Sequence, residues 1–492
     1  MVMRLYTDRP DFFNDISEEI RLFLPAAELE LSTDIPVSDN GDYVLAVLGN
    51  DGISFAAEAE FVRRGEHFSY THISPYRNET PLIEKRYAKR CIKISVFRCL
   101  RKAFPSAPLP WGSLTGIRPT RLLRELILTE GEAEARRLML DEFDVTPEKY
   151  GLARKIVTVQ EDILSSVKPN DVDVYIGIPF CRTRCLYCSF ASQLRTKKTD
   201  MAPYLSALEK DISLGAAMAE EAGLRVRSLY LGGGTPTVLT ADELRSLIEH
   251  TLSAYRVAPG TEFTVEAGRP DTITREKLEA LLSCGVTRIS VNPQTMCDST
   301  LRAVGRDHSS EDIIDCFNTA RAMGFDSVNM DLIAGLPGED ESSMRHSIDE
   351  ILKLGPDCLT VHTLAIKRSS RLHEHLNEIV LPDADVVERM TAIGAEGAER
   401  LGMLPYYMYR QKYMAGNMEN VGYSKPDKVC IYNIDMMEDA LSIIAHGAGA
   451  MTKRVFNEGG RIERVPNPKD IDTYIAKLAA TNEARHRLFM EI

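Results

Sequence analysis

Three closely spaced cysteines are the strongest chemical signal in this chain of 492 residues. Cys181, Cys185 and Cys188 stand in a C-x3-C-x2-C spacing directly after an alternating apolar segment, 172–178, so three thiols share one loop at a strand's end. Three such thiolates can bind three irons of a 4Fe-4S cluster and leave the fourth iron open to chelation by a small molecule. The alternatives are three unrelated cysteines or a zinc site. Zinc would need a fourth nearby Cys or His, and the stretch 183–201 offers no further one.

A run of three glycines follows the next predicted strand. Gly232, Gly233 and Gly234, followed by Thr235, present bare backbone against which a ligand can lie where any Cβ would clash. A glycine-rich turn by itself is often only a tight connection between a strand and a helix. Its place one strand–helix unit after the cysteine loop favours a ligand-binding role.

Polar side chains also stand at or near the ends of the later predicted strands. Glu266 ends the third strand, Ser290 and Gln294 flank the end of the fourth, and Arg306 and Asp331 come next. A zwitterionic sulfonium nucleoside needs an acid for its ammonium, a base for its carboxylate and polar partners for its ribose hydroxyls. Each residue alone has a structural alternative, but the ordered set favours a site of that kind.

Strand and helix patterns alternate regularly from residue 172 onward. A capping box at 240–243 begins one helix, and another begins at Ser310 and ends at Gly324. Six strand–helix units predict a parallel sheet closed into a partial (β/α) barrel, in which chemistry gathers at the carboxyl ends of the strands. The predicted strands are 172–178, 227–232, 262–267, 286–292, 327–334 and 358–364.

The first part of the chain has a different pattern. Strand-like segments Asp42–Leu48 and Ile53–Phe61 flank an Asn-Asp-Gly turn, which predicts a hairpin. Helical patterns follow at 84–104, 121–142 and 147–167, and no group of residues has catalytic spacing. The first of these helices, 84–104, is basic. Its charge has two interpretations, a solvated face or a nucleic-acid patch, and the former is favoured. We therefore expect three regions, namely an α+β extension (1–168), a barrel (169–382) and a mainly helical C-terminal region (383–492).

Charge and composition exclude several classes of partner. The 59 basic and 72 acidic residues give a net charge of −13, which argues against nucleic acid or an anionic membrane as the main partner. No apolar run is long enough to span a membrane, and the first residues lack a signal-peptide core. Most of the ten cysteines are isolated in the sequence, which fits reduced thiols, so the expected location is the cytoplasm.

The ordered motifs resemble those of the radical S-adenosylmethionine (SAM) enzymes, and in particular the oxygen-independent coproporphyrinogen III oxidase-like (HemN-like) family. The motifs are YIGIPFCRTRCLYC, LGGGTPT, VEAGRPD, RISVNPQT, VGRDHS and NMDLIAGLPGE, together with a C-terminal GAGA. The N-terminal extension, with PWGSLTGIRPT, and the stretch TVHTLAIKR at 360–368 are most similar to the coproporphyrinogen dehydrogenase HemZ branch. The resemblance implies a partial (β/α)6 radical SAM barrel with a 4Fe-4S cluster and SAM as cofactors.

The resemblance also assigns roles to residues. It implies that the three cysteines bind iron and that the glycines, Glu266 and Arg306 contact the methionine part of SAM. Gln294 and Asp331 would contact its ribose, and Tyr175, Thr235 and Ser290 would complete the cofactor-binding set. The implied reaction is oxidative decarboxylation of coproporphyrinogen III propionates to vinyl groups, with a low-potential donor such as flavodoxin or ferredoxin supplying electrons.

A tetrapyrrole with several carboxylates would need aromatic faces and cations in an acidic protein. The segment YYMYRQKY at 406–413 offers both, although an amphipathic packing segment is an equal alternative. The candidate substrate residues are Arg368, Arg371, Arg410 and Lys412.

The chain departs from the family pattern at several positions. Phe190 stands where the oxidases place a further cysteine, as it does in the haem-chaperone branch, and Gly177 replaces a histidine. The chaperones' downstream HN-x-x-YW element has only 431–434 as its counterpart, without His or Trp. Two alternatives to the oxidase therefore stay open, a haem-binding chaperone and a radical SAM enzyme that acts on haem or another tetrapyrrole.

Overall fold

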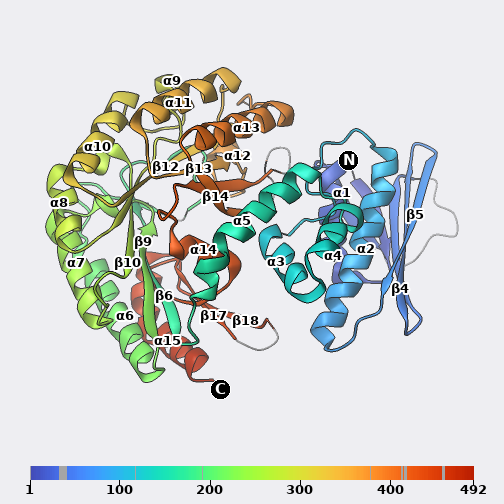
Figure 1. Ribbon diagram of the computed structural model, residues 1–492, viewed down its shortest axis with the longest axis horizontal. Helices are drawn as coiled ribbons and strands as arrows, with labels where there is room; N and C mark the ends of the chain where they lie inside the picture. Colours follow the sequence, from blue (N-terminus) through green and yellow to red (C-terminus); the bar gives the residue numbers. More distant parts are fainter. Residues whose placement is uncertain are drawn as a thin grey trace. The chain divides into compact units, whose positions relative to one another are not determined.

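The computed structural model divides the chain into two compact units, Met1–Arg154 and Lys155–Ile492 (Figure 1). No helix among the described residues is long and apolar enough to cross a membrane. The residues that the structure describes are 2–32, 41–116, 118–190, 192–376, 378–411, 414, 418–456 and 460–491.

The first unit is a mixed five-stranded sheet with two helices packed on one face. The sheet order is β2 (Glu28–Ser32), β1 (Val2–Thr7), β3 (Tyr43–Asn50), β4 (Ser54–Arg63), β5 (Glu66–Pro75). The predicted hairpin is confirmed as β3 and β4, because its register runs from Asn50 opposite Phe55 to Tyr43 opposite Val62. The strands β1, β2 and β5 were not predicted.

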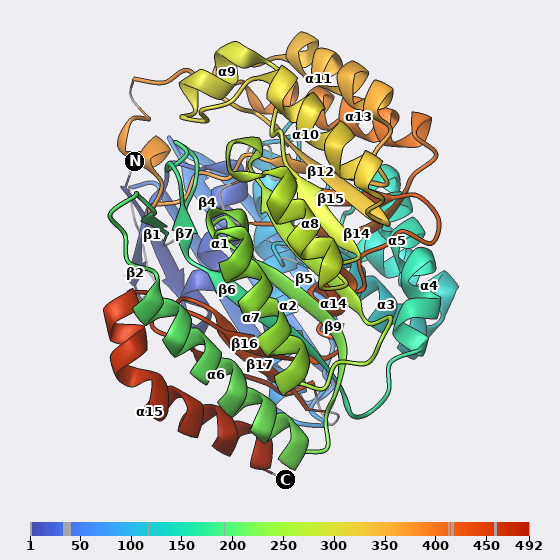
Figure 2. The same cartoon turned by 90° about the vertical axis from the view of Figure 1, so that its left-hand side faces the viewer.

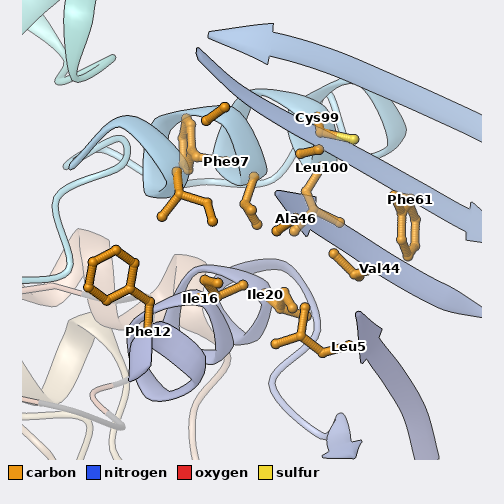
Figure 3. Packing of buried hydrophobic residues seen from close by; sticks show 14 of the residues in the cluster. Leu5, Phe12, Ile16, Ile20, Val44, Ala46, Phe61, Phe97, Cys99 and Leu100 are labelled. Carbon is orange, nitrogen blue, oxygen red and sulfur yellow. The ribbon is translucent and has the colours of Figure 1, made fainter. Parts of the chain in front are cut away.

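The core of this unit lies between the sheet and the helices α1 (Phe13–Phe23) and α2 (Pro81–Ala103). Figure 3 shows Ile16 and Ile20 of α1, Phe97 of α2, and Leu5 and Val44 of the sheet gathered in this core. All of them are at most 1% exposed, so these side chains form the centre of the core. The chain continues with α3 (Pro119–Glu130), α4 (Glu132–Arg137), a π turn (Leu138–Glu142) and α5 (Pro147–Ser165), whose first residues belong to this unit.

The second unit is built on an eleven-stranded sheet with seven parallel strands at its centre. All six predicted strands are present, with their ends within a few residues of the expected ones. Figures 1 and 2 show the helices lying along the outer side of this curved sheet. The central strands in spatial order are β16 (Ser442–His446), β6 (Asp171–Ile178), β9 (Arg225–Gly233), β10 (Glu262–Gly268), β11 (Arg288–Val291), β12 (Ser327–Ala334) and β13 (Cys358–Thr363).

The helix ends follow the predicted capping residues. Thr240 Oγ1 accepts from the Glu243 amide and the Glu243 carboxylate accepts from the Thr240 amide, which completes the capping box of α7. The helix α10 begins at Ser310 as predicted, with Ser309 as its N-cap, and Gly324 ends it in a left-handed conformation. The outer helices are α6 (Ala202–Glu221), α7 (Ala241–Ala254), α8 (Arg275–Ser283), α9 (Asp298–Ala303), α10 (Ser310–Met323), α11 (Glu341–Leu354), α12 (Arg371–Glu374) and α13 (Ala384–Arg400).

The C-terminal region combines the expected helices with five strands that the sequence did not predict. The strands β14 (Leu404–Tyr409) and β15 (Asn420–Ser424) extend the sheet beyond β13 in antiparallel fashion. At the other edge β16 pairs with β6, and β17 (Met451–Val455) and β18 (Ile462–Pro466) follow it. Two more helices, α14 (Ile431–Glu438) and α15 (Ile471–Met490), complete the region.

The division of the chain into compact units differs from the three expected regions. The units meet between Arg154 and Lys155, inside α5, whereas the expected first boundary lies at residue 168. Residues 383–492 belong to the same compact unit as the parallel strands, because all five of their strands join the same sheet. The strands β14 and β15 lie at one edge, and β16, β17 and β18 lie at the other.

Candidate functional site

A cavity of about 420 Å³ lies where the carboxyl ends of the parallel strands meet. Its wall is formed by residues that end or follow β6, β9, β10, β11, β12 and β13, which is the edge where parallel α/β sheets place their ligands. The predicted residues that line it are Cys181, Cys185, Cys188, Gly233, Gly234, Thr235, Glu266, Ser290, Gln294, Arg306 and Asp331. The fold therefore brings most of the predicted cofactor site together.

The cysteine loop is held by backbone hydrogen bonds to distant parts of the unit. Leu186 donates to the Val304 carbonyl and its own carbonyl accepts from Leu372. Cys181 lies in β7 (Phe180–Cys181), which pairs with β8 (Gln193–Leu194), and its sulfur accepts from the Thr235 hydroxyl at 3.6 Å. The loop thus presents three thiols to the cavity from a fixed backbone.

The donor set fits an iron–sulfur cluster. All three thiols are free and line one cavity. Among the described residues no three His, Cys, Asp or Glu side chains converge closely enough to hold a single metal ion. Thiolates that bind three different irons of a cluster need not converge on one point, so this finding is compatible with a cluster.

The glycines are needed for close packing of β9 against the cysteine loop. A Cβ on Gly234 would lie 2.5 Å from the Phe180 carbonyl oxygen and 3.0 Å from Cys181 Sγ. Gly233 has a φ of +112°, which side-chain-bearing residues rarely adopt. Gly232 does not line the cavity, and a Cβ there would crowd the Glu266 carboxyl group.

The Glu266 carboxylate has one strong partner. It accepts a 2.7 Å hydrogen bond from the Tyr230 hydroxyl, and the Tyr230 ring stacks on Tyr432 at 4.5 Å. Burial raises the pKa of Glu266 to about 7, although the Tyr230 hydrogen bond opposes the shift. Tyr175 does not line the cavity; its ring stacks at 6.2 Å on Tyr230, so it contacts the residue that orients Glu266.

Asp331 is surrounded by polar groups. Asn329 Nδ2 donates to it at 2.8 Å, and His362 Nε2 lies 3.8 Å from its carboxylate. Burial alone would raise the pKa of Asp331, but His362 and Asn329 outweigh it and hold the pKa below its ordinary value. His362 in turn lies 3.4 Å from the Tyr409 hydroxyl, so Asp331, His362 and Tyr409 form a chain along the cavity.

The other predicted residues also have distinctive local structure. Gln294 has a φ of +69°, and its amide donates to the Asp331 carbonyl, so a strained backbone stands at this site. Ser290 Oγ is buried and has no hydrogen-bond partner among the described residues. Arg306 donates to the Asn292 carbonyl at 2.6 Å and to the Tyr187 hydroxyl at 3.1 Å.

The predicted substrate residues are placed differently. Arg368 and Arg371 are exposed and do not line the cavity, and Arg410 is only 3% exposed and lies outside the lining. Lys412 lies outside the described residues. The cations that line the cavity beside Arg306 are Arg184, Arg269 and Lys367.

Several lining residues were not found from the sequence. Arg269 stands three residues after Glu266 in the same motif, so its charge and position were a usable signal. Tyr407 and Tyr409 of β14 lie in the segment 406–413 that was predicted as a substrate-binding candidate, but no local signal showed which of its tyrosines face the cavity. Asn420 of β15 was not predicted.

Comparisons with known proteins agree with this geometry. Residues 175–351 match the model of the Radical SAM superfamily. The chain is 38% identical over 384 residues to the oxygen-independent coproporphyrinogen-III oxidase-like protein HemZ of Bacillus subtilis, covering 77% of each protein. It is 34% identical over 194 residues to the heme chaperone HemW of Bacillus subtilis, covering 39% of this chain and 50% of HemW.

A solved structure shows the same fold. Coproporphyrinogen III oxidase (HemN) from Escherichia coli matches with a TM-score of 0.52 and 22% identity, over 66% of this chain and 73% of that chain. Radical SAM proteins use a 4Fe-4S cluster and SAM, and the residues in the cavity suit both. The chain belongs to the oxygen-independent coproporphyrinogen III oxidase-like family of the radical SAM superfamily.

Proposed function

We propose that this protein is a radical SAM oxidoreductase that converts propionate groups of coproporphyrinogen III to vinyl groups without oxygen. The observation that carries the proposal is that one cavity contains the cysteine triad, the polar set for SAM and additional cations. The name of the HemZ relative supports the same substrate class.

The chain's own residues divide the work in the cavity. Cys181, Cys185 and Cys188 would hold the cluster, and the cluster with bound SAM would supply the hydrogen abstraction that the reaction needs. The Glu266 carboxylate receives the SAM ammonium and Arg306 receives its carboxylate, while Gln294 and Asp331 bind the ribose hydroxyls. In this arrangement the protein contributes position and exclusion of water, and the cofactors contribute the chemistry.

Substrate recognition falls to the cations and tyrosines that line the same cavity. Arg184 and Lys367 are exposed, so they can meet propionates that enter from solvent. The rings of Tyr407 and Tyr409 lie nearly parallel, 9° apart, and provide flat surfaces for a tetrapyrrole. A protein with a net charge of −13 needs such local cations to bind a tetracarboxylate. A low-potential carrier such as flavodoxin or ferredoxin in the reducing cytoplasm would supply the electrons.

An anaerobic assay tests the proposal. Reconstituted, reduced protein is given SAM, coproporphyrinogen III and an electron acceptor. We expect protoporphyrinogen IX, with one deoxyadenosine and one CO2 for each vinyl group formed. Deoxyadenosine that forms at the same rate with and without porphyrinogen, with no decarboxylated product, would contradict the oxidase proposal.

A second candidate function, haem binding and delivery, is favoured by one residue. His362 lines the cavity, and imidazole is a common axial ligand of haem iron. The similarity to HemW supports the same candidate. Haem titration of the cluster-free protein separates the two functions, because a carrier should bind haem stoichiometrically and His362→Ala should abolish the spectrum of the ligated iron.

A further inference from the structure

The side chain of Arg269 contacts the cysteine loop at Cys185 and Thr183. Its Nη1 donates to Cys185 Sγ at 3.6 Å and to the hydroxyl and carbonyl oxygens of Thr183 at 2.6 and 3.3 Å. The residue is 5% exposed, so this positive charge is almost completely removed from water. A buried guanidinium therefore touches one predicted cluster ligand and the backbone two residues before it.

The guanidinium of Arg269 is fixed on its other side by an aspartate. Nε and Nη2 donate to the two oxygens of Asp271 at 2.9 and 3.1 Å, which is the bidentate geometry that lysine cannot form. The backbone is also held, since the Thr272 amide and hydroxyl both donate to the Arg269 carbonyl. The side chain has little freedom to leave Cys185.

The same aspartate links Arg269 to the proposed SAM site. His308 Nδ1 lies 3.8 Å from Asp271, and His308 Nε2 accepts from Arg306 Nε at 3.4 Å. Cys185, Arg269, Asp271, His308 and Arg306 thus form one buried chain. An arginine that only stabilised the fold would not need to donate to a thiol that faces a ligand cavity.

We propose that Arg269 is a positioning residue for the cluster, which holds the Cys185 thiolate in place and raises the cluster's reduction potential. The inference rests on the cluster assignment of the proposed function but not on the identity of the substrate. Reduction adds one negative charge, so a fixed cation beside a ligand sulfur stabilises the reduced form. Hydrogen bonds to ligand sulfurs act in the same direction, and outer residues of this kind tune metal centres.

The test is a redox titration of the reconstituted protein, followed by electron paramagnetic resonance, without SAM or porphyrinogen. Arg269→Gln removes the charge and should make reduction about tenfold less favourable, which is about 59 mV toward more negative potential for a one-electron couple. Arg269→Lys keeps the charge and should stay within about threefold of the unmodified protein.

Arg288→Gln is the matched control. Arg288 is also buried, and its Nη2 lies 3.3 Å from Cys358 Sγ, but neither residue lines the cavity. This variant should leave the potential within about threefold. It separates the specific effect at Cys185 from the general effect of losing a buried arginine.

The measured potentials of the Arg269 variants decide whether its charge acts on the cluster. A full cluster in Arg269→Gln with a potential shifted by less than about threefold would overturn the proposal. If the glutamine variant does not retain iron, the lysine variant decides by the same limit, because a larger shift there would show that charge is not the cause. No substrate is present, so failure of this inference and failure of the proposed reaction are distinguishable.

Discussion

The cavity is built from two sets of residues that differ in origin. The cofactor side comes from the cysteine loop and the ends of β9 to β12, and it holds thiols, glycines and charged groups. The C-terminal side comes from β13, β14, β15 and α14, and it holds His362, Tyr407, Tyr409, Asn420 and Asn433. The first set suits a small charged cofactor, whereas the second suits a large flat ligand with hydrogen-bonding edges.

The difference shows where specificity for a substrate has to reside. The residues of the cofactor side lie at or after the carboxyl ends of successive parallel strands, so their place is dictated by the order of the strands. The C-terminal side depends on antiparallel pairing, with a register shift between Pro405 and Tyr407. Small changes in that pairing would alter which side chains reach the cavity without touching the cofactor side.

Changing the cysteines should have the largest effect on the cofactor side of the cavity. Alanine at Cys181, Cys185 or Cys188 removes one of three thiolates, so the protein should lose its iron after anaerobic reconstitution. Iron and labile sulfide content and the visible absorbance are the measurements. Cys284→Ala and Cys297→Ala should retain both, because neither residue lines the cavity. Normal cluster content in a variant that lacks all three would show that the cofactor side is assigned to the wrong residues.

The carboxylates of the cofactor side should give the next largest effect. Glu266→Gln and Asp331→Ala each remove a carboxylate and so leave a polar group of bound SAM without its partner, which costs about 1–3 kcal/mol or more of binding free energy. We expect SAM affinity to fall about tenfold or more, with iron content unchanged. Equilibrium dialysis with labelled SAM measures it.

Glu339→Gln is the matched control for these carboxylates. Glu339 is a buried carboxylate whose partner is the Thr295 hydroxyl, at 2.5 Å, and it does not line the cavity. The Glu339→Gln variant should bind SAM with unchanged affinity. If Glu266→Gln and Asp331→Ala also bound SAM normally, the polar set would not be the SAM site.

The extent to which the sequence predicted this molecule follows the same division. Six of the seven parallel strands were predictable because buried strands form short apolar runs between helices with clear caps, such as Thr240 and Gly324. The cofactor residues were predictable because each motif is local and ends a strand.

The C-terminal side could not be predicted, for a physical reason. Tyr407 and Tyr409, two residues apart in β14, line the cavity, whereas Tyr406 does not. All three tyrosines pack in or against one hydrophobic cluster with Tyr432 and Ile434, so apolar packing does not distinguish them. Arg410 follows Tyr409 and is buried outside the lining. Without the strand assignment, YYMYRQKY gives no means of choosing among its tyrosines and cations.

The pH dependence of SAM binding should give a moderate effect. Burial raises the pKa of Glu266 to about 7, but a SAM ammonium needs the ionised carboxylate. SAM affinity should therefore increase as the pH rises through about 7 and fall up to about tenfold one unit below it. The Glu266→Gln variant should lose most of this dependence, and an equally steep profile in that variant would assign the titration to another group.

The same shift has a consequence for stability with the opposite sign. The folded-state pKa of Glu266 lies above its ordinary value of 4.5, so the native state holds more protons than the unfolded state between 4.5 and about 7. The contribution of Glu266 to the free energy of unfolding should decrease as the pH rises through that window. Glu266→Gln should reduce this decrease in urea titrations.

The smallest expected effect belongs to the exposed cations at the cavity. Lys367 lines the cavity but is exposed, so its attraction to a propionate is weakened by solvent. Lys367→Glu should raise the KM for coproporphyrinogen III by about fivefold while the rate of SAM cleavage without substrate stays unchanged. Arg371→Glu makes the same change of charge at an exposed residue outside the lining and should have less effect. Equal KM increases in both variants would mean that the overall field of the protein, rather than the cavity, attracts the carboxylates. A slower SAM cleavage in Lys367→Glu without porphyrinogen would instead place this residue on the cofactor side, and the two sides would then no longer be separable.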